Sequence, residues 1–261
     1  MAITVIRPQP KTKTLLLLLL AVLLVGCAGG STNPPAPAPS GMAMVSFNYD
    51  DGFVSGYDSL PIFDNAGIKV TEFIITGRMA GEHGPQYVTA AQVLDAERRG
   101  HEIAAHTRTH PELPTLTNDE QITEIQGSKE DLEKLLGHPV GNFAYPYGEH
   151  NDDSVADVQA AGFASARIVG PDLNGYQTNP YLLYAYPLQR DTTIDDIKGW
   201  VDQAKANQEW LILLIHHVDE DPSISVYTVQ SGVLQQTVAY VREQKIQTVT
   251  MSEGIHLYYG R

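Results

Sequence analysis

Cysteine is almost absent from this chain, because Cys27 is the only one among 261 residues. A single thiol forms no disulfide within the chain, so a hydrophobic core has to stabilise the fold. Basic residues are also scarce, with 17 Lys and Arg against 31 Asp and Glu. The net charge of −14 argues against binding nucleic acid or an anionic membrane through a basic surface.

The N-terminal apolar run is too short to cross a bilayer, which takes about 20 residues. This run, residues 15–25, follows Arg7, Lys11 and Lys13 and leads into Gly26-Cys27. A basic start, a short apolar stretch and small residues at its end predict a secretory signal. The last four residues, Leu-Val-Gly-Cys, resemble a bacterial lipobox, in which the cysteine is lipidated and becomes the mature N-terminus. An ordinary signal peptide with an incidental cysteine is the alternative.

The chain divides into three predicted parts. Residues 1–26 are a lipoprotein signal peptide, residues 27–42 are an uncharged tether rich in Pro, Ala and Gly, and residues 43–261 form one domain. We therefore expect an extracytoplasmic protein anchored to a membrane through a lipid on Cys27. The outer membrane is favoured because Ala28 stands where some bacteria place the Asp that retains lipoproteins in the inner membrane.

Apolar, β-branched stretches alternate with helical patterns through the domain. Strands are predicted at 44–49, 69–75, 101–105, 141–146, 163–168, 183–188, 210–216 and 246–250. Helices with start and stop signals are predicted at 90–99, 118–136, 194–207 and about 229–244. This alternation predicts a parallel α/β sheet, either closed as a barrel or doubly wound.

Unusual polar residues follow four of the predicted strands. Asp50 and Asp51 come after the first, His106 after the third, Pro146-Tyr147-Gly148 after the fourth, and His216 ends the seventh. The carboxyl ends of parallel strands share one face of the sheet, so these segments are expected to meet there. For the two acids, the alternative is a simple turn.

His106 and His110 are four residues apart, which would place both on one face of a helical turn and allow them to share a metal ion. The spacing is that of the HExxH zinc motif, but Thr107 stands in place of its Glu, which excludes that metalloprotease chemistry. Two surface or capping histidines remain the alternative. A nucleophilic Ser mechanism finds no support because Gly-x-Ser-x-Gly is absent.

Taken in order, four segments resemble the motifs of the polysaccharide deacetylase family, the NodB-homology domain of carbohydrate esterase family 4. They are Asn48-Tyr-Asp-Asp-Gly52, His106-Thr-Arg-Thr-His110, Ala144-Tyr-Pro-Tyr-Gly148 and Leu213-Leu-Ile-His216. The third is similar in style to exported poly-N-acetylglucosamine deacetylases. The resemblance covers about residues 44–253 and implies an irregular (β/α) barrel of about seven parallel strands.

The resemblance also implies a metal centre. Asp51, His106 and His110 would hold one divalent ion, zinc by preference, with cobalt and nickel as alternatives. Asp50 would act as the general base and His216 as the general acid. His217 is the alternative acid, since adjacent residues of a strand point to opposite faces.

The backbone N–H of Tyr147 would stabilise the oxyanion. One family residue is missing, because Ala144 occupies the place of the Arg that the family associates with the base. We expect Arg190 to supply that guanidinium. The family also has an acid that tunes the catalytic histidine, and here Asp191 or Asp195 could take that place. Trp200 could supply the aromatic wall of the site. Because Trp200 lies in a predicted helix, it is also a candidate for the core.

These features predict a hydrolase that removes acetyl groups from an N-acetylglucosamine-containing polysaccharide. An esterase acting on acetylxylan requires the same residues and is one alternative. A non-catalytic glycan-binding lipoprotein on the same fold is the other. The expected partners are an acetylated polysaccharide and a membrane reached through the lipid, with no nucleic acid and no protein partner.

Overall fold

The computed structural model describes residues 41–79, 84 and 86–260. The predicted signal peptide, Cys27 and nearly all of the predicted tether lie outside the described residues. Within them, every helix falls short of the length and apolarity that a membrane crossing requires.

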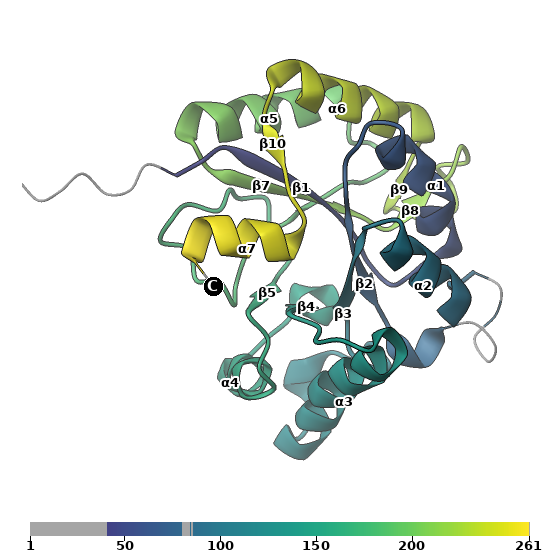
Figure 1. The fold of residues 1–261 in the computed structure, drawn as a ribbon, viewed down its shortest axis with the longest axis vertical. Helices are drawn as coiled ribbons and strands as arrows, with labels where there is room; N and C mark the ends of the chain where they lie inside the picture. The colour runs from purple at the N-terminus through teal and green to yellow at the C-terminus, as the bar shows by residue number, and fades with distance from the viewer. Residues whose placement is uncertain (1–40, 80–83, 85, 261) are drawn as a thin grey trace, which may run out of the picture. The chain divides into compact units, whose positions relative to one another are not determined.

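A sheet of parallel strands forms the centre of the domain (Figure 1). Its main path has the order β5-β4-β3-β2-β1-β7-β6, and β10 also pairs with β1. The strands are β1 (Met44–Tyr49), β2 (Thr71–Ile74), β3 (Glu102–Ala105), β4 (Asn142–Ala144), β5 (Ser165–Arg167), β6 (Tyr186–Pro187), β7 (Trp210–Ile215) and β10 (Gln247–Thr248). Two further strands, β8 (His217–Val218) and β9 (Thr228–Val229), pair with each other.

The sheet curls until its two ends meet. An isolated parallel bridge joins Arg167 of β5 to Leu183, in the segment that leads into β6. The Leu183 amide donates to the Ala166 carbonyl at 3.1 Å, and the Ile168 amide donates to the Leu183 carbonyl at 2.8 Å. Because β6 pairs in turn with β7, these bonds complete the ring. The predicted irregular (β/α) barrel of about seven parallel strands is confirmed.

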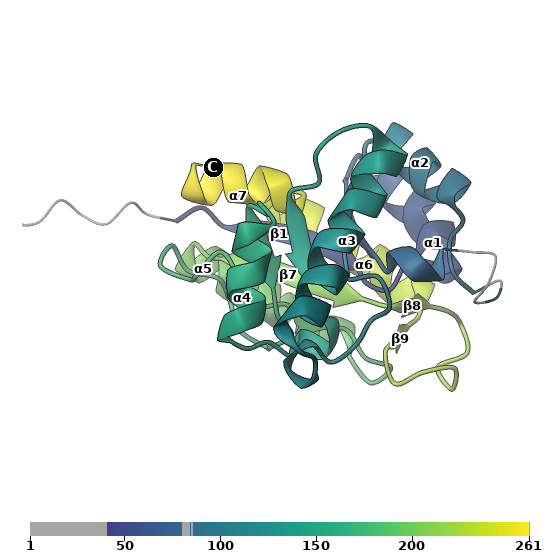
Figure 2. The same cartoon turned by 90° about the horizontal axis from the view of Figure 1, so that it is seen from below.

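Seven α-helices pack around this sheet in the described part of the chain. They are α1 (Val54–Asp64), α2 (Ala90–Arg98), α3 (Asn118–Leu136), α4 (Asp152–Ala160), α5 (Ile194–Asn207), α6 (Ser231–Gln244) and α7 (Met251–Tyr259). Helices α5 and α6 lie side by side in Figure 1, and α3 lies beside α4 in Figure 2.

Capping residues define the helices that the sequence predicts best. The Thr117 amide donates to the Glu120 carboxylate at 2.9 Å at the start of α3, and Gly137 ends that helix with a left-handed φ of 81°. Thr193 and Asp196 form the same capping box at the start of α5. The predicted bounds 118–136 and 194–207 are therefore confirmed, because local bonds set them.

Helix α1 is not among the predicted helices, and its composition explains why. Gly56 and Pro61 both disfavour a helix interior. Gly56 is nevertheless required, because a Cβ atom there would lie 2.9 Å from the ring of Tyr49 on β1. Close packing of α1 on the sheet therefore outweighs the unfavourable propensity of its residues.

Glu72 is a buried carboxylic acid in the middle of β2. Its side chain is 3% exposed, and its Oε1 atom has no hydrogen-bond partner among the described residues. Burial raises the pKa of Glu72 to about 7. Between about pH 4.5 and pH 7 the folded domain therefore keeps Glu72 mostly neutral, whereas the unfolded chain carries it mostly ionised.

Glu72→Gln is expected to remove a pH dependence of stability. Because the folded pKa is raised, the wild-type chain loses stability as pH rises from 4.5 to about 7, by roughly 3 kcal/mol. The neutral amide does not titrate, so the variant should lose less over this range. Urea unfolding at pH 4.5 and 7.5 measures the difference, with Glu243→Gln on the exposed face of α6 as the control. Equal losses in the wild type and both variants would contradict the assignment.

Candidate functional site

A cavity of about 180 Å³ opens at the carboxyl ends of the strands. Its lining residues come from segments that follow β1, β3, β4, β5 and β7 and that lie near β6 and β9: Asp50, Asp51, His106, His110, Tyr147, Val169, Pro187, His216 and Tyr227. The structure thus brings all six predicted site residues together. It also adds Tyr227, which the sequence analysis missed.

The backbone after β1 turns the two acids toward different partners. The Asp50 amide still donates to the Ile215 carbonyl of β7 at 2.9 Å, as a strand residue does. Asp51 and Gly52 then adopt left-handed conformations, with φ of 69° and 72°. A non-glycine residue with such a φ is uncommon, and contacts of the surrounding structure have to hold it there. The turn directs Asp50 and Asp51 into the cavity as neighbours with separate contacts.

The two histidines do not lie on a helical turn, as the sequence spacing had suggested. Thr107 and His110 have left-handed φ values of 62° and 65°, and the segment is irregular. Thr107 holds this shape, because its Oγ1 donates to the His106 carbonyl at 2.6 Å and accepts from the His110 amide at 3.0 Å. The rings of His106 and His110 converge with centroids 4.8 Å apart.

Asp51, His106 and His110 form a set of donors that fits a divalent cation. Asp51 Oδ1 lies 3.5 Å from His106 Nε2 and 3.3 Å from His110 Nε2, and it is buried without a hydrogen-bond partner. His106 Nδ1 lies 2.8 Å from the Ala144 carbonyl, to which only a protonated nitrogen can donate. The Nε2 atom of neutral His106 therefore carries a lone pair that faces the carboxylate, and a cation between them satisfies both.

The electrostatics of the three residues favour the same interpretation. Burial alone would raise the pKa of Asp51, but the nearby imidazoles of His106, His216 and His110 hold that pKa well below its usual range. Burial, with the neighbouring His106, lowers the pKa of His110 to about 3. At neutral pH the site thus offers one carboxylate and two imidazoles, which is a donor set that binds zinc and related ions.

The guanidinium that pairs with Asp50 belongs to Arg167 on β5. Arg167 is fully buried, forms an ion pair with Asp50, and lies over the Phe73 ring with 4.4 Å to its centroid. Burial lowers the pKa of Arg167 to about 9, so the group remains charged at neutral pH. The prediction that Arg190 supplies this guanidinium is therefore wrong. A charged residue inside a predicted strand was the available signal for Arg167.

His216, rather than His217, lines the cavity. The His216 ring lies 4.9 Å from the Tyr227 ring, whereas His217 stacks on Phe53 at 3.8 Å. Burial lowers the pKa of His216 to about 4. Its Nδ1 atom has no hydrogen-bond partner among the described residues. The expected acid partner, Asp191 or Asp195, therefore does not reach it in this structure.

Tyr147 and Tyr227 provide the aromatic walls of the cavity. Tyr147 adopts a left-handed φ of 60°, packs edge-on against His110 with centroids 4.5 Å apart, and is 58% exposed. Tyr227 packs against His216 from the segment before β9. Trp200, the expected aromatic wall, instead packs against Tyr186 at the edge of the core.

Comparison with known proteins identifies the family. Residues 38–166 match the model of the family described as polysaccharide deacetylase. Chitin deacetylase 1 of Cryptococcus neoformans var. grubii is 32% identical over 108 residues, which are 40% of this chain and 21% of that protein. The chain spans half or less of the length of the curated relatives that it matches first.

Solved structures share the fold at low identity. The chitin deacetylase from Colletotrichum lindemuthianum is 19% identical with a TM-score of 0.59, over 82% of this chain and 88% of that one. The Xyl-CE4 domain of a multidomain xylanase from the hindgut metagenome of Trinervitermes trinervoides is 19% identical with a TM-score of 0.59, over 84% of this chain and 92% of that one. The family match over residues 38–166 identifies a polysaccharide deacetylase domain, the NodB-homology domain of carbohydrate esterase family 4, in this chain, and the solved structures show the same fold.

Proposed function

We propose that this domain hydrolyses the acetamide of N-acetylglucosamine units in a polysaccharide and that it depends on a divalent ion, zinc by preference. The observation that carries the proposal is the meeting of two differently partnered acids in one cavity. Asp51 faces two imidazoles, and Asp50 is paired with a buried guanidinium. Hydrolysis of an amide by water needs a charge to polarise the carbonyl and a base to activate the water, and these two acids divide that work.

Asp51, His106 and His110 would hold the ion. When bound, it supplies a Lewis acid that polarises the acetyl carbonyl and lowers the pKa of water. Each histidine contributes a nitrogen lone pair. The low pKa of His110 keeps its ring neutral. The bond from His106 Nδ1 to the Ala144 carbonyl leaves the Nε2 lone pair of neutral His106 free. Asp51 contributes the negative charge.

Asp50 takes the proton of the attacking water. Arg167 pairs with its Oδ1 atom, while its Oδ2 atom lies 3.8 Å from His106 Nε2 and so faces the metal-binding residues. The Arg167 charge keeps the carboxylate ionised in its buried position and fixes its orientation. Arg167 therefore acts as a positioning residue, and Asp50 acts as the general base.

His216 protonates the leaving nitrogen, and the Tyr147 backbone N–H donates to the oxyanion. Because burial lowers the pKa of His216, its imidazole is neutral before substrate binds. The negative charge that develops on the tetrahedral intermediate stabilises the imidazolium form, which His216 reaches by taking up a proton from solvent at the open cavity. The proton reaches the leaving group at the stage at which the C–N bond breaks.

We also propose that the protein is exported and anchored to a membrane through a lipid on Cys27. The support is the basic start, the short apolar run and the Leu-Val-Gly-Cys sequence at residues 24–27. An extracytoplasmic position would give the domain access to cell-envelope or environmental polysaccharides.

Acetate release is expected to depend on metal. Chelation should abolish release from N-acetylglucosamine oligomers, and zinc or cobalt should restore it, because Asp51, His106 and His110 hold the ion. Acetylated xylan is assayed in parallel. Release from xylan alone would assign ester hydrolysis instead. Metal-loaded protein without release from either polymer would contradict the proposed substrate. Failure to bind metal would indicate a non-catalytic glycan-binding domain.

Asp50→Asn should reduce turnover by about 10²- to 10⁴-fold while the protein still binds zinc, since only the base is lost. Asp51→Asn should weaken zinc binding itself. Turnover and zinc content by atomic absorption are measured for both, with Asp58→Asn on the exposed side of α1 as a control that keeps both properties. Activity retained by the Asp50 variant would assign the base to another residue.

Cys27→Ser is expected to move the protein from the membrane fraction to the soluble extracytoplasmic fraction, because serine cannot carry the thioether-linked lipid. Cell fractionation and metabolic labelling with a radioactive fatty acid measure this change. If label and membrane association persist in the variant, the lipid is not on Cys27.

A further inference from the structure

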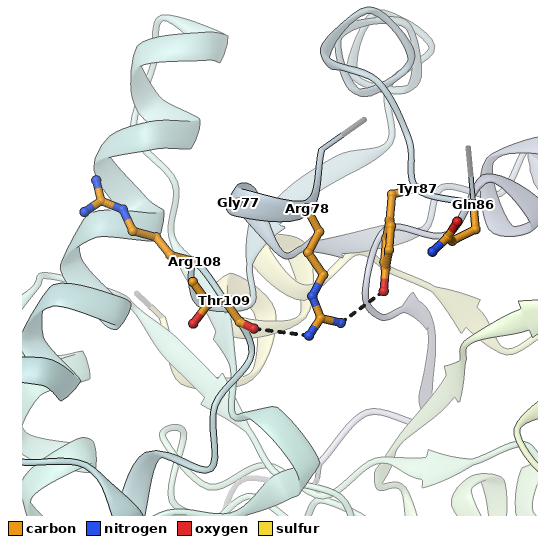
Figure 3. Close-up of a pocket in the computed structure, with 6 residues that line it drawn as sticks. All are labelled: Gly77, Arg78, Gln86, Tyr87, Arg108 and Thr109. Atoms are coloured by element: carbon orange, nitrogen blue, oxygen red, sulfur yellow. Dashed lines mark hydrogen bonds between the residues drawn. The ribbon is translucent and has the colours of Figure 1, made fainter. Parts of the chain in front are cut away.

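A second cavity, of about 280 Å³, lies between the segments that follow β2 and β3 (Figure 3). Its lining residues are Gly77, Arg78, Gln86, Tyr87, Arg108 and Thr109, none of which lines the catalytic cavity. Its wall nevertheless continues into the site, because Thr109 directly precedes His110. The Gly77 amide donates to the Arg108 carbonyl at 2.8 Å, which joins the two sides of the cavity through the backbone.

Arg78 is held in place in this cavity by neutral groups. Its Nη1 donates to the Tyr87 hydroxyl at 3.0 Å and its Nη2 donates to the Thr109 carbonyl at 3.2 Å, as Figure 3 shows. The guanidinium lies 5.7 Å from the centroid of the Tyr87 ring. Two of its five N–H groups are thus engaged, which leaves three donors for a ligand.

Arg78 lacks a carboxylate partner among the described residues, although the chain has a net charge of −14. Arg108, on the same cavity, is different. It binds Asp131 through two bonds of 2.8 and 2.9 Å, and its head group points away from Arg78 in Figure 3. Among the described residues, the cavity's positive charge without a carboxylate partner is therefore that of Arg78.

Arg78 also lies close to the metal-binding residues. The carbonyl that accepts from its Nη2 belongs to Thr109, the residue directly before His110. On the other side, Tyr87 stacks on Phe53 at 5.2 Å, and Phe53 stacks on His217. A ligand at Arg78 would therefore lie beside an acetylated sugar bound at the metal-binding residues.

We propose that this cavity is a subsite for a sugar that carries a carboxylate and is linked to the acetylated sugar. The inference rests on the proposed deacetylase function. A guanidinium fixed by neutral partners matches the planar geometry of a carboxylate and loses little side-chain freedom on binding it. The cavity volume is slightly below the usual range of small-ligand sites, which suits one sugar unit.

Arg78→Gln tests the subsite with two matched probes. One is an oligosaccharide that alternates N-acetylglucosamine with glucuronic acid, and the other is the same oligosaccharide with its carboxylates converted to methyl amides. The wild-type protein should have a lower KM for the acidic probe. The variant should raise that KM about tenfold, and its KM values for the two probes should become equal. Arg98→Gln, which removes one exposed guanidinium from α2, should preserve the wild-type preference.

An equal rise in KM for both probes would overturn the proposal, because it would show that Arg78 contacts a neutral part of the glycan. Unchanged KM values for both would overturn it as well. If the metal-loaded wild type releases no acetate from either probe, the proposed function fails for these substrates. In that case, calorimetry of the acidic probe tests the subsite independently of turnover. A tenfold weaker affinity of the Arg78→Gln variant than of the wild type would still support the subsite.

Discussion

The buried ion pair between Asp50 and Arg167 is the interaction on which the rest of the site depends. A carboxylate in the interior of a barrel is tolerated only with a counter-charge, and removing either partner leaves an uncompensated buried charge. The two residues are 117 positions apart and come from strands on different parts of the sheet. Arg167 takes its position because β5 is hydrogen-bonded on one side to β4 and on the other to the segment around Leu183. Closure of the barrel thus orients Asp50, the proposed base.

The same constraint explains why two adjacent acids coexist at the end of β1. Like charges on neighbouring residues repel each other, and burial increases this effect. The structure separates their partners: Asp50 pairs with a guanidinium inside the barrel, and Asp51 turns toward His106 and His110. The left-handed conformation of Asp51 makes this division. This conformation is strained only at the turn, and the contacts of the surrounding barrel hold it in place.

Sequence reasoning located most of the site because strand ends carry a strong signal. Asp50 and His216 stand where polar residues follow an apolar strand, and parallel strands then bring such ends together. Arg167 was missed because its partner is fixed by tertiary closure, which no local pattern encodes. Tyr227 was missed because it lies in the connection between β8 and β9, two short strands that pair only with each other. Thr107 shows the limit of spacing arguments, since its hydroxyl stabilises a turn that an i, i+4 pattern cannot distinguish from a helix.

Two arginines in this acidic domain illustrate how environment divides one side chain between two roles. Arg167 is fully buried, and its charge is matched by Asp50. Arg78 is half-buried and fixed by a hydroxyl and a carbonyl, neither of which neutralises it. Neutral hydrogen-bond partners keep a guanidinium oriented and leave its charge available to a ligand. A carboxylate partner would orient the guanidinium and also neutralise its charge. In the described part of the chain, Arg78 has no carboxylate partner, whereas Arg167 has one. This difference distinguishes the proposed substrate subsite at Arg78 from the structural ion pair of Arg167.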